Sequence, residues 1–171
     1  TDAQSNEITA IPKLLQILEL KGAIVTIDAM GCQKEIARQI VDGGGDYVLA
    51  VKENQPKLCA ALAEHFTHLH ESDFADAEVR QLTTVDAGHG RKERRHYYVT
   101  PLPESMLALR DDWKGLTSVG QVINITQRDG REVSEVRYHI LSLAPQVKRY
   151  AAAVRGHWGI ENSLHWVLDV T

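Results

Sequence analysis

Residues 23–52 have the sequence AIVTIDAMGCQKEIARQIVDGGGDYVLAVK, in which two short apolar runs flank a segment with helical spacing. The runs 23–27 and 47–51 are rich in aliphatic residues and show little polar alternation, which is typical of strands buried on both faces. Residues 33–41 place their apolar side chains three and four positions apart, as a helix does. We therefore predict a strand-helix-strand unit with two parallel strands and a right-handed crossover.

An acidic residue, Asp28, directly follows the first of these strands, and Lys52 directly follows the second. In a parallel pair both residues lie at the same edge of the sheet, where open α/β sheets bind their ligands. Asp28 is therefore a candidate ligand for a divalent cation. The alternative is that it caps the next turn, which is the more frequent role of an isolated Asp at the end of a strand.

The composition indicates one globular domain in a reducing compartment. The chain has 171 residues, of which 43% are hydrophobic and 25% charged, and no apolar run approaches the length of about 20 residues that spans a bilayer. Cys32 and Cys59 are far apart and have no metal-ligand spacing, so we expect free, buried thiols and a cytoplasmic protein. The chain opens on Thr1 and stops after an apolar run, so we expect a piece of a longer protein.

The rest of the chain divides into three predicted parts: residues 1–77, 78–144 and 145–171. The first continues the α/β core, with helices over residues 5–20 and 54–70. The second is rich in β structure, with strands over 79–85, 96–100, 116–126 and 133–143, a short helix over 104–113, and a hairpin turn at Asp129-Gly130. The third is a closing helix from Pro145 to about Val170, which we expect to pack back on the sheet.

The predicted closing helix carries His157, Glu161 and His165 at intervals of four residues, so that all three share one face. Glu161 can then reach the edge of the sheet where Asp28 lies. Two such carboxylates can hold Mg²⁺ or Mn²⁺, because these hard cations prefer carboxylate oxygen. The alternatives are a solvated Glu161 and two histidines on the helix surface.

The net charge of −4 argues against a dedicated basic nucleic-acid-binding module, so candidate DNA contacts must come from local charge. Residues 89–96 contain Arg91, Lys92, Arg94 and Arg95 against one acid, which is enough for a phosphate-binding patch or for a solvated hairpin. Lys52 can reach a substrate phosphate. Asn54 can support Asp28 or cap the next helix.

Three blocks of sequence resemble the H-repeat-associated group of DDE transposases. They are TIDAMGCQ (26–33), GDYVLAVK (45–52) and HWGIENSLHWVLDV (157–170). The segments SNEITAIP (5–12) and HGRKERR (89–95) also match that group. The likeness covers nearly the whole chain.

This resemblance implies a partial ribonuclease H-like α/β fold with an antiparallel β-rich insertion before the final catalytic helix. Asp28 would be the second acid of the catalytic triad and Glu161 the third, with the first Asp on an earlier strand that this chain lacks. The complete enzyme would use Mg²⁺ or Mn²⁺ to cleave and join double-stranded DNA, at transposon ends and target, as a homo-oligomer without a membrane. This fragment alone would be inactive.

The same resemblance assigns roles on the closing helix. His157 stands where related transposases carry an Arg, so a DNA-binding role is implied for it, and Leu168 occupies the position of a Lys. His165 would support the site.

Three alternatives remain open. His157, Glu161 and His165 could bind zinc, although they extend over about two turns of helix. His65, His68 and His70, with Glu64 and Glu71 beside them, could form another metal cluster. The chain could also be a non-catalytic DNA-binding or oligomerising remnant. In that case the missing first strand would expose the edge of strand 23–27, and we expect self-association there.

Overall fold

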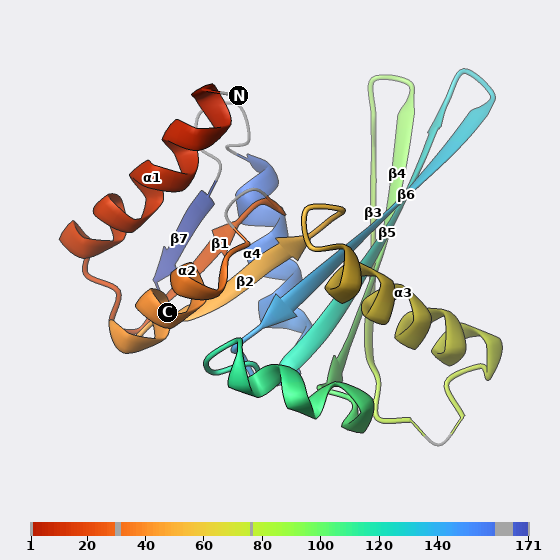
Figure 1. Cartoon of the computed structure of the whole chain (residues 1–171). Coiled ribbons are helices and arrows are strands. Elements are labelled where there is room, and N and C mark those ends of the chain that lie inside the picture. Colours follow the sequence, from red (N-terminus) through yellow and green to blue (C-terminus); the bar gives the residue numbers. More distant parts are fainter. Residues whose placement is uncertain (1, 30–31, 76, 160–165, 171) are drawn as a thin grey trace.

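The computed structural model describes residues 2–29, 32–75, 77–159 and 166–170, and for residues 2–9, 157–159 and 166–170 it describes the backbone course alone. The strands form one seven-stranded sheet in the order β3-β4-β5-β6-β2-β1-β7, with helices on both faces (Figure 1). The helices are α1 (Asp2–Ile17), α2 (Lys34–Asp42), α3 (Pro56–Glu71), the 3₁₀ helix η2 (Glu104–Asp111) and α4 (Val147–Gly159). The strands are β1 (Ala23–Ile27), β2 (Asp46–Val51), β3 (Arg80–Gly88), β4 (Arg91–Pro101), β5 (Ser118–Arg128), β6 (Arg131–Leu141) and β7 (Trp166–Val170).

The predicted strand-helix-strand unit is confirmed. β1 and β2 pair in parallel, with Val25 opposite Tyr47 and Ile27 opposite Leu49. Helix α2 connects them and buries its apolar side chains against the sheet. The turn from α2 into β2 places Gly44 at a φ of +86°, a conformation that glycine adopts without the steric cost of a side chain.

The four antiparallel strands do not form a separate β unit, because they continue the same sheet. β6 pairs antiparallel with β2, which places Leu141 opposite Val48. The two hairpins, β3–β4 and β5–β6, turn at His89-Gly90 and at Asp129-Gly130 and project beyond the helices (Figure 1). β4 is longer than predicted, since the charged run at residues 91–95 hides its alternation but still forms a paired strand.

The predicted closing helix is wrong in its last part. α4 ends at Gly159, and Trp166–Val170 forms β7. β7 pairs antiparallel with β1, with Leu168 opposite Val25. The aromatic and β-branched residues of this segment favour a strand, and the edge of β1 offers the hydrogen-bonding groups that such a strand needs. The exposed edge predicted for residues 23–27 is therefore covered by the chain itself, which removes the basis for self-association there.

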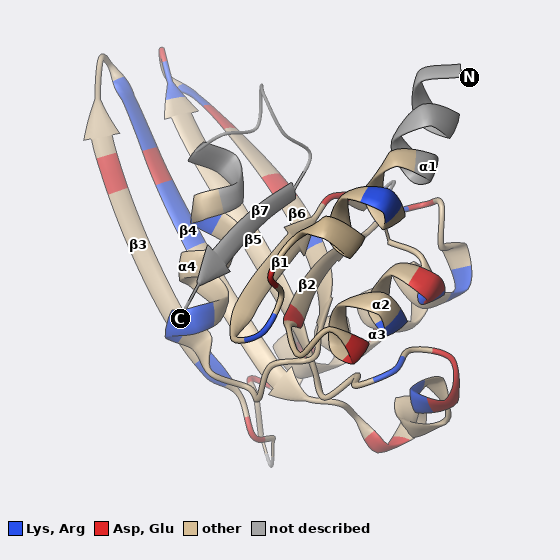
Figure 2. Cartoon of the chain, turned by 90° about the vertical axis from the view of Figure 1, so that its left-hand side faces the viewer, with Lys and Arg blue, Asp and Glu red and all other residues tan. Residues whose placement is uncertain are grey.

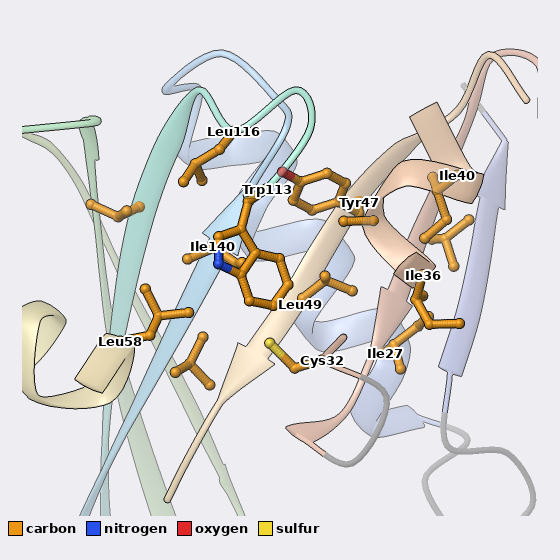
Figure 3. Packing of buried hydrophobic residues seen from close by; sticks show 14 of the residues in the cluster. Ile27, Cys32, Ile36, Ile40, Tyr47, Leu49, Leu58, Trp113, Leu116 and Ile140 are labelled. Atoms are coloured by element: carbon orange, nitrogen blue, oxygen red, sulfur yellow. The ribbon is translucent and has the colours of Figure 1, made fainter. Parts of the chain in front are cut away.

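Two buried clusters fill the two sides of the sheet. On one side, α1, α2, α3 and η2 enclose a cluster that includes Tyr47, Phe66 and Trp113, part of which is shown in Figure 3. On the other side, α4 covers a smaller cluster around Tyr97 and Tyr150. Tyr150 is fully buried and lies against Gly120, where an added Cβ would come within 2.4 Å of the tyrosine ring. The helix thus packs closely only because residue 120 has no side chain.

Helix α3 packs on the sheet through two histidines as well as through apolar side chains. The Nε2 atom of His65 lies 2.9 Å from Oγ1 of Thr100, and Nε2 of His70 lies 2.8 Å from Oε1 of Gln121. These hydrogen bonds account for two of the three histidines that the sequence offered as a metal cluster. No helix in the described part of the chain is both long and apolar enough to cross a membrane.

The half-buried position of His65 predicts a loss of stability in mild acid. Burial, and then the nearby charge of His68, lower the pKa of His65 below the ordinary value of 6.5. Between the folded pKa and about 6.5 the unfolded chain therefore binds more protons than the folded chain. The contribution of neutral His65 to the free energy of unfolding is complete above pH 6.5 and is lost as the pH falls through the folded pKa. We expect the free energy of unfolding, measured with urea, to decrease across this window.

The variant His65→Gln isolates this effect, because the amide can still bond Thr100 but does not titrate. His96, whose pKa is also lowered by burial and by Arg94, keeps its own contribution in both proteins. We expect a flatter pH profile in the variant. Identical profiles for the two proteins would contradict the assignment.

Candidate active site at the carboxyl edge of the parallel strands

Asp28 lies immediately after β1, at the carboxyl edge of the parallel pair, and its side chain is half-buried. The pairing of Ile27 with Leu49 places Asp28 beside Ala50, and Ala50 in turn pairs with His139 of β6. Because side chains alternate along strands, these three residues form one row on the face of the sheet that α4 covers. The carboxylate is thus held at the junction of parallel and antiparallel strands.

A cavity of about 20 Å³ lies at this row, enough for one water molecule or one ion. Its lining comes from both parallel strands, from β6 and from α4: Thr26, Ile27, Asp28, Val48, Ala50, Arg137, His139 and Val154. The cavity therefore combines one carboxylate with two nitrogen-bearing side chains. Only a ligand as small as a water molecule or an ion fits inside it.

His139 is buried and its position is fixed by α4. Its Nδ1 atom lies 2.7 Å from the hydroxyl oxygen of Tyr150, so the two groups share a hydrogen bond. Burial, and then the neighbouring Tyr97, raise the pKa of Tyr150 well above its usual value of 10. The phenol consequently keeps its proton at neutral pH, and the pair orients the imidazole beside the cavity.

Arg137 precedes His139 by two residues on β6, so the two side chains lie on the same face of the sheet. One third of its side chain is exposed, and its Nε atom donates to Oε1 of Glu135 over 3.1 Å. It therefore lies between the cavity and solvent. A guanidinium in this position supplies positive charge at the mouth of the cavity.

Two side chains from the segment before α3 hold the loop that follows Asp28. The side-chain amide of Asn54 donates to the carbonyl oxygen of Ala29, and Nε2 of Gln55 donates to the carbonyl oxygen of Cys32 over 3.0 Å. The N-cap position of α3 is Gln55, and no side-chain cap hydrogen bond forms there. Of the two roles considered for Asn54, the contact favours support of the Asp28 loop.

Removal of the Asn54 amide is expected to loosen this loop. Asn54→Ala leaves the carbonyl of Ala29 without its side-chain donor, which costs about 1 kcal/mol in the free energy of unfolding. We expect faster proteolysis near residues 29–33 than in the wild type, measured by limited digestion and mass spectrometry. Lys57→Ala, an exposed change in the first turn of α3, is the control. Equal digestion of the two variants would count against the assignment of Asn54 as a support of the loop after Asp28.

Lys52 is exposed and lines a different hollow, together with Asn54, Ala29 and Tyr138. It shares the sheet edge with Asp28, as predicted, but not the cavity. A contact between Lys52 and a substrate phosphate remains a prediction.

The basic segment predicted to bind DNA is divided between the two faces of β4. Arg91 and Arg95 lie on the face that α4 covers further along the strand, while Lys92 and Arg94 lie on the opposite face. Arg95 is only 15% exposed and bonds Asp86 over 2.8 Å as well as Glu93. The four residues therefore do not form a single patch. Figure 2 shows how acidic and basic residues alternate along this strand.

The predicted partners of Asp28 on the closing segment cannot be placed. Glu161 and His165 lie outside the described residues, and for His157 only the backbone at the end of α4 is described. The alternative of a zinc site formed by these three residues therefore also lies outside the described side chains. Among the side chains that the structure does describe, no group of three or more His, Cys, Asp or Glu is arranged to hold a metal ion.

Sequence reasoning missed Arg137, His139 and Tyr150. The alternation of β6 was visible, but nothing in it shows that β6 pairs with β2 and so places His139 beside Asp28. The Tyr150 ring was equally hidden, since its burial depends on Gly120 of a strand 30 residues earlier in the chain.

Comparison with known sequences identifies related proteins. A family model described as "Transposase DDE domain" matches residues 1–171. The chain is 44% identical over 173 residues to "Putative transposase YncI" of Escherichia coli O157:H7, an alignment that covers 99% of this chain and 44% of that protein. It is 41% identical to "Putative protein YbfL" of Escherichia coli strain K12, with coverage of 99% and 45%.

A third relative is "H repeat-associated putative transposase YhhI" of Escherichia coli strain K12, which is 40% identical, again with coverage of 99% of this chain and 45% of the relative. The chain thus spans less than half the length of the relatives it matches.

Proposed function

Because this chain belongs to the family of transposase DDE domains, an insertion-sequence type of transposase, we propose that it forms part of a catalytic core that cleaves and joins DNA. In this proposal Asp28 is one of three acids, Glu161 is another, and the remaining Asp comes from a part of the parent protein outside residues 1–171. The observation that carries the proposal is the position of Asp28, which lines an ion-sized cavity at the carboxyl edge of the parallel strands.

The donor set around the cavity suits a divalent cation only in part. The Asp28 carboxylate is the hard oxygen ligand that Mg²⁺ and Mn²⁺ prefer, and the cavity is large enough for one ion. Among the described residues Asp28 is the one carboxylate in its lining, so the remaining ligands would be Glu161 and the upstream Asp. When bound, the ion would supply charge stabilisation during in-line attack on a phosphodiester.

The chain's own residues would orient and neutralise the DNA at this site. Arg137 at the mouth would hold a non-bridging phosphate oxygen by charge-assisted hydrogen bonds. His139, fixed by Tyr150, would keep the cavity wall rigid so that the Asp28 carboxylate keeps its orientation. His157, one turn before Glu161 in the sequence, is proposed as a further phosphate contact, and His165 as a supporting residue.

A second candidate function is a DNA-binding or oligomerising remnant without catalysis. It is favoured by the lining of the Asp28 cavity, in which Asp28 is the one carboxylate among the described residues. Its simplest oligomer, through β1, has no support, because β7 already occupies that edge. Homo-oligomerisation through another surface remains a proposal for the parent protein.

A chimera tests the catalytic proposal. This chain replaces the matching segment of an active full-length relative, and Mn²⁺-dependent cleavage of transposon-end DNA is measured with and without a chelator. We expect cleavage and joining that require the metal. A folded chimera that binds end DNA but never cleaves it, beside an active relative, would favour the remnant.

A further inference from the structure

Three arginines lie in direct register at the tips of the two hairpins. Arg91 of β4 pairs with Arg128 of β5, and Arg128 pairs across the next turn with Arg131 of β6. Paired residues project from the same face of a sheet, and neighbouring strands are about 4.8 Å apart. The three guanidinium groups therefore form a row about 10 Å wide on one face. We name these residues the arginine row.

The row has too few counter-charges on its own face. Arg91 forms an ion pair with Glu93, which also binds Arg95. Over the part of the chain that the structure describes, neither Arg128 nor Arg131 forms an ion pair, and both are exposed. Like charges directly opposite each other destabilise a sheet. An arrangement of this kind is relieved by an anion that binds all three groups.

The surroundings of the arginine row leave room for such an anion. The tips border an open hollow of about 640 Å³, whose lining includes all three arginines, Lys92, and the glycines Gly88, Gly90 and Gly130. The tips extend beyond the helices, and no helix or strand in the described ranges covers them (Figure 1). The acids that line this hollow are Asp129, in the turn, and Glu132, which faces the opposite side of β6 and bonds Gln127. Glu93 and Glu135 lie on the face of the row, further along β4 and β6.

The arginine row also lies on the same face as the Asp28 cavity. Arg131 and Arg137 are six residues apart on β6, so both project from one face, about 20 Å from each other. A duplex whose phosphate lies at Arg137 would reach the tips after about six base pairs, at 3.4 Å per step. A free phosphate ion would need no such alignment with the catalytic cavity.

We propose that the arginine row binds the phosphate backbone of duplex DNA on the flank of the Asp28 site. This inference rests on the proposed function for its choice of DNA as the ligand. It assigns Arg128 and Arg131 to DNA binding, which the sequence did not suggest, and it restricts the contact to the face of the sheet that carries Asp28.

The test measures binding by the unmodified chain, without metal, to a short fluorescent duplex of mixed sequence. The double variant Arg128→Gln/Arg131→Gln removes two contacts. We expect at least about tenfold weaker binding at low salt, and a slope of log K against log salt that is less steep by about two. Because the row is repulsive in the free protein, the urea midpoint of the variant should equal or exceed that of the wild type.

The matched comparison is Lys92→Gln/Arg94→Gln, which removes the same charge from the opposite face of β4, in the neighbouring hairpin. We expect this pair to weaken binding less than the first pair does. Equal losses in the two variants would show that overall charge, and not the row, binds DNA. Displacement of the duplex by inorganic phosphate, at a concentration equal to that of the phosphate groups in the duplex, would show a free-anion site instead. Either result overturns the proposal, as would an unchanged affinity and salt slope in the first variant.

The result of this binding test can be distinguished from the result of the cleavage test of the catalytic proposal. The binding assay contains a chelator, so it does not depend on Asp28 or on any metal. Loss of binding in the Arg128/Arg131 variant together with an inactive chimera would retain the arginine row and reject catalysis. An active chimera whose DNA affinity is unchanged by the Arg128/Arg131 substitutions would retain catalysis and reject the arginine row.

Discussion

Cleavage by the chimera is expected to fall by about 1000-fold or more when Asp28 is replaced by Asn. The substitution keeps the size of the side chain and removes the charged oxygen that we propose holds the cation. Metal-assisted charge stabilisation contributes several kcal/mol to such reactions, and about 4 kcal/mol corresponds to this change in rate. The measurement is the single-turnover rate of Mn²⁺-dependent cleavage of end DNA.

Two controls separate this loss from a general defect. Glu53→Gln removes an acid near the same edge that lines a different hollow, and it should leave the rate near that of the unmodified chimera. Asp28→Asn itself should bind DNA at least as tightly as the unmodified chimera, because a negative charge near the phosphates is gone. Cleavage by Asp28→Asn at the unmodified rate would falsify the assignment of Asp28.

The free energy of unfolding is expected to fall by about 3–5 kcal/mol in Tyr150→Ala. Tyr150 is fully buried at the centre of the cluster under α4, with its ring against Gly120 and near the ring of Tyr97. Loss of the ring leaves a cavity and leaves the buried Nδ1 of His139 without its partner. The measurement is urea unfolding followed by circular dichroism.

Tyr150→Phe separates the ring from its hydroxyl group. It keeps the packing on Gly120 and removes only the hydrogen bond to His139, so we expect a loss of about 1–2 kcal/mol. Exposed Arg155, which joins α4 to Asp86 over 3.0 Å, should contribute far less, because surface ion pairs stabilise little. Similar losses in the Ala and Phe variants would show that the ring does not hold α4 on the sheet.

Much of the core was predictable from residues 23–52, because their periodicity is local. The spacing of Ile36 and Ile40 on α2 needs no knowledge of the rest of the chain, and glycine at position 44 marks the turn. The antiparallel hairpins were also visible, since Asp129-Gly130 is a strong turn signal. The ends of β4 were not, because the charged residues 91–95 do not alternate with apolar ones.

The closing segment shows how local patterns can mislead. Its apolar residues fit a helical stripe that includes Ala153, yet Trp166–Val170 pairs with β1. Helical spacing and strand propensity compete in such a short segment, and the unpaired edge of a distant strand decides between them. The predicted DNA-binding residues also depend on tertiary structure. The basic patch predicted at residues 91–95 is divided between two faces by strand alternation, and two of the three residues of the arginine row come from other strands.

The sequence by itself determined the parallel unit, the place of Asp28 after its first strand, and the relationship to DDE transposases. These depend on residues that are neighbours in the chain or on blocks of sequence that match directly. Only the tertiary structure decided that His139 and Arg137 line the cavity of Asp28, that Tyr150 packs on Gly120 and bonds His139, and that three arginines lie side by side. Each of those contacts depends on which strand lies beside which and in what register, and register is set by packing across the whole sheet.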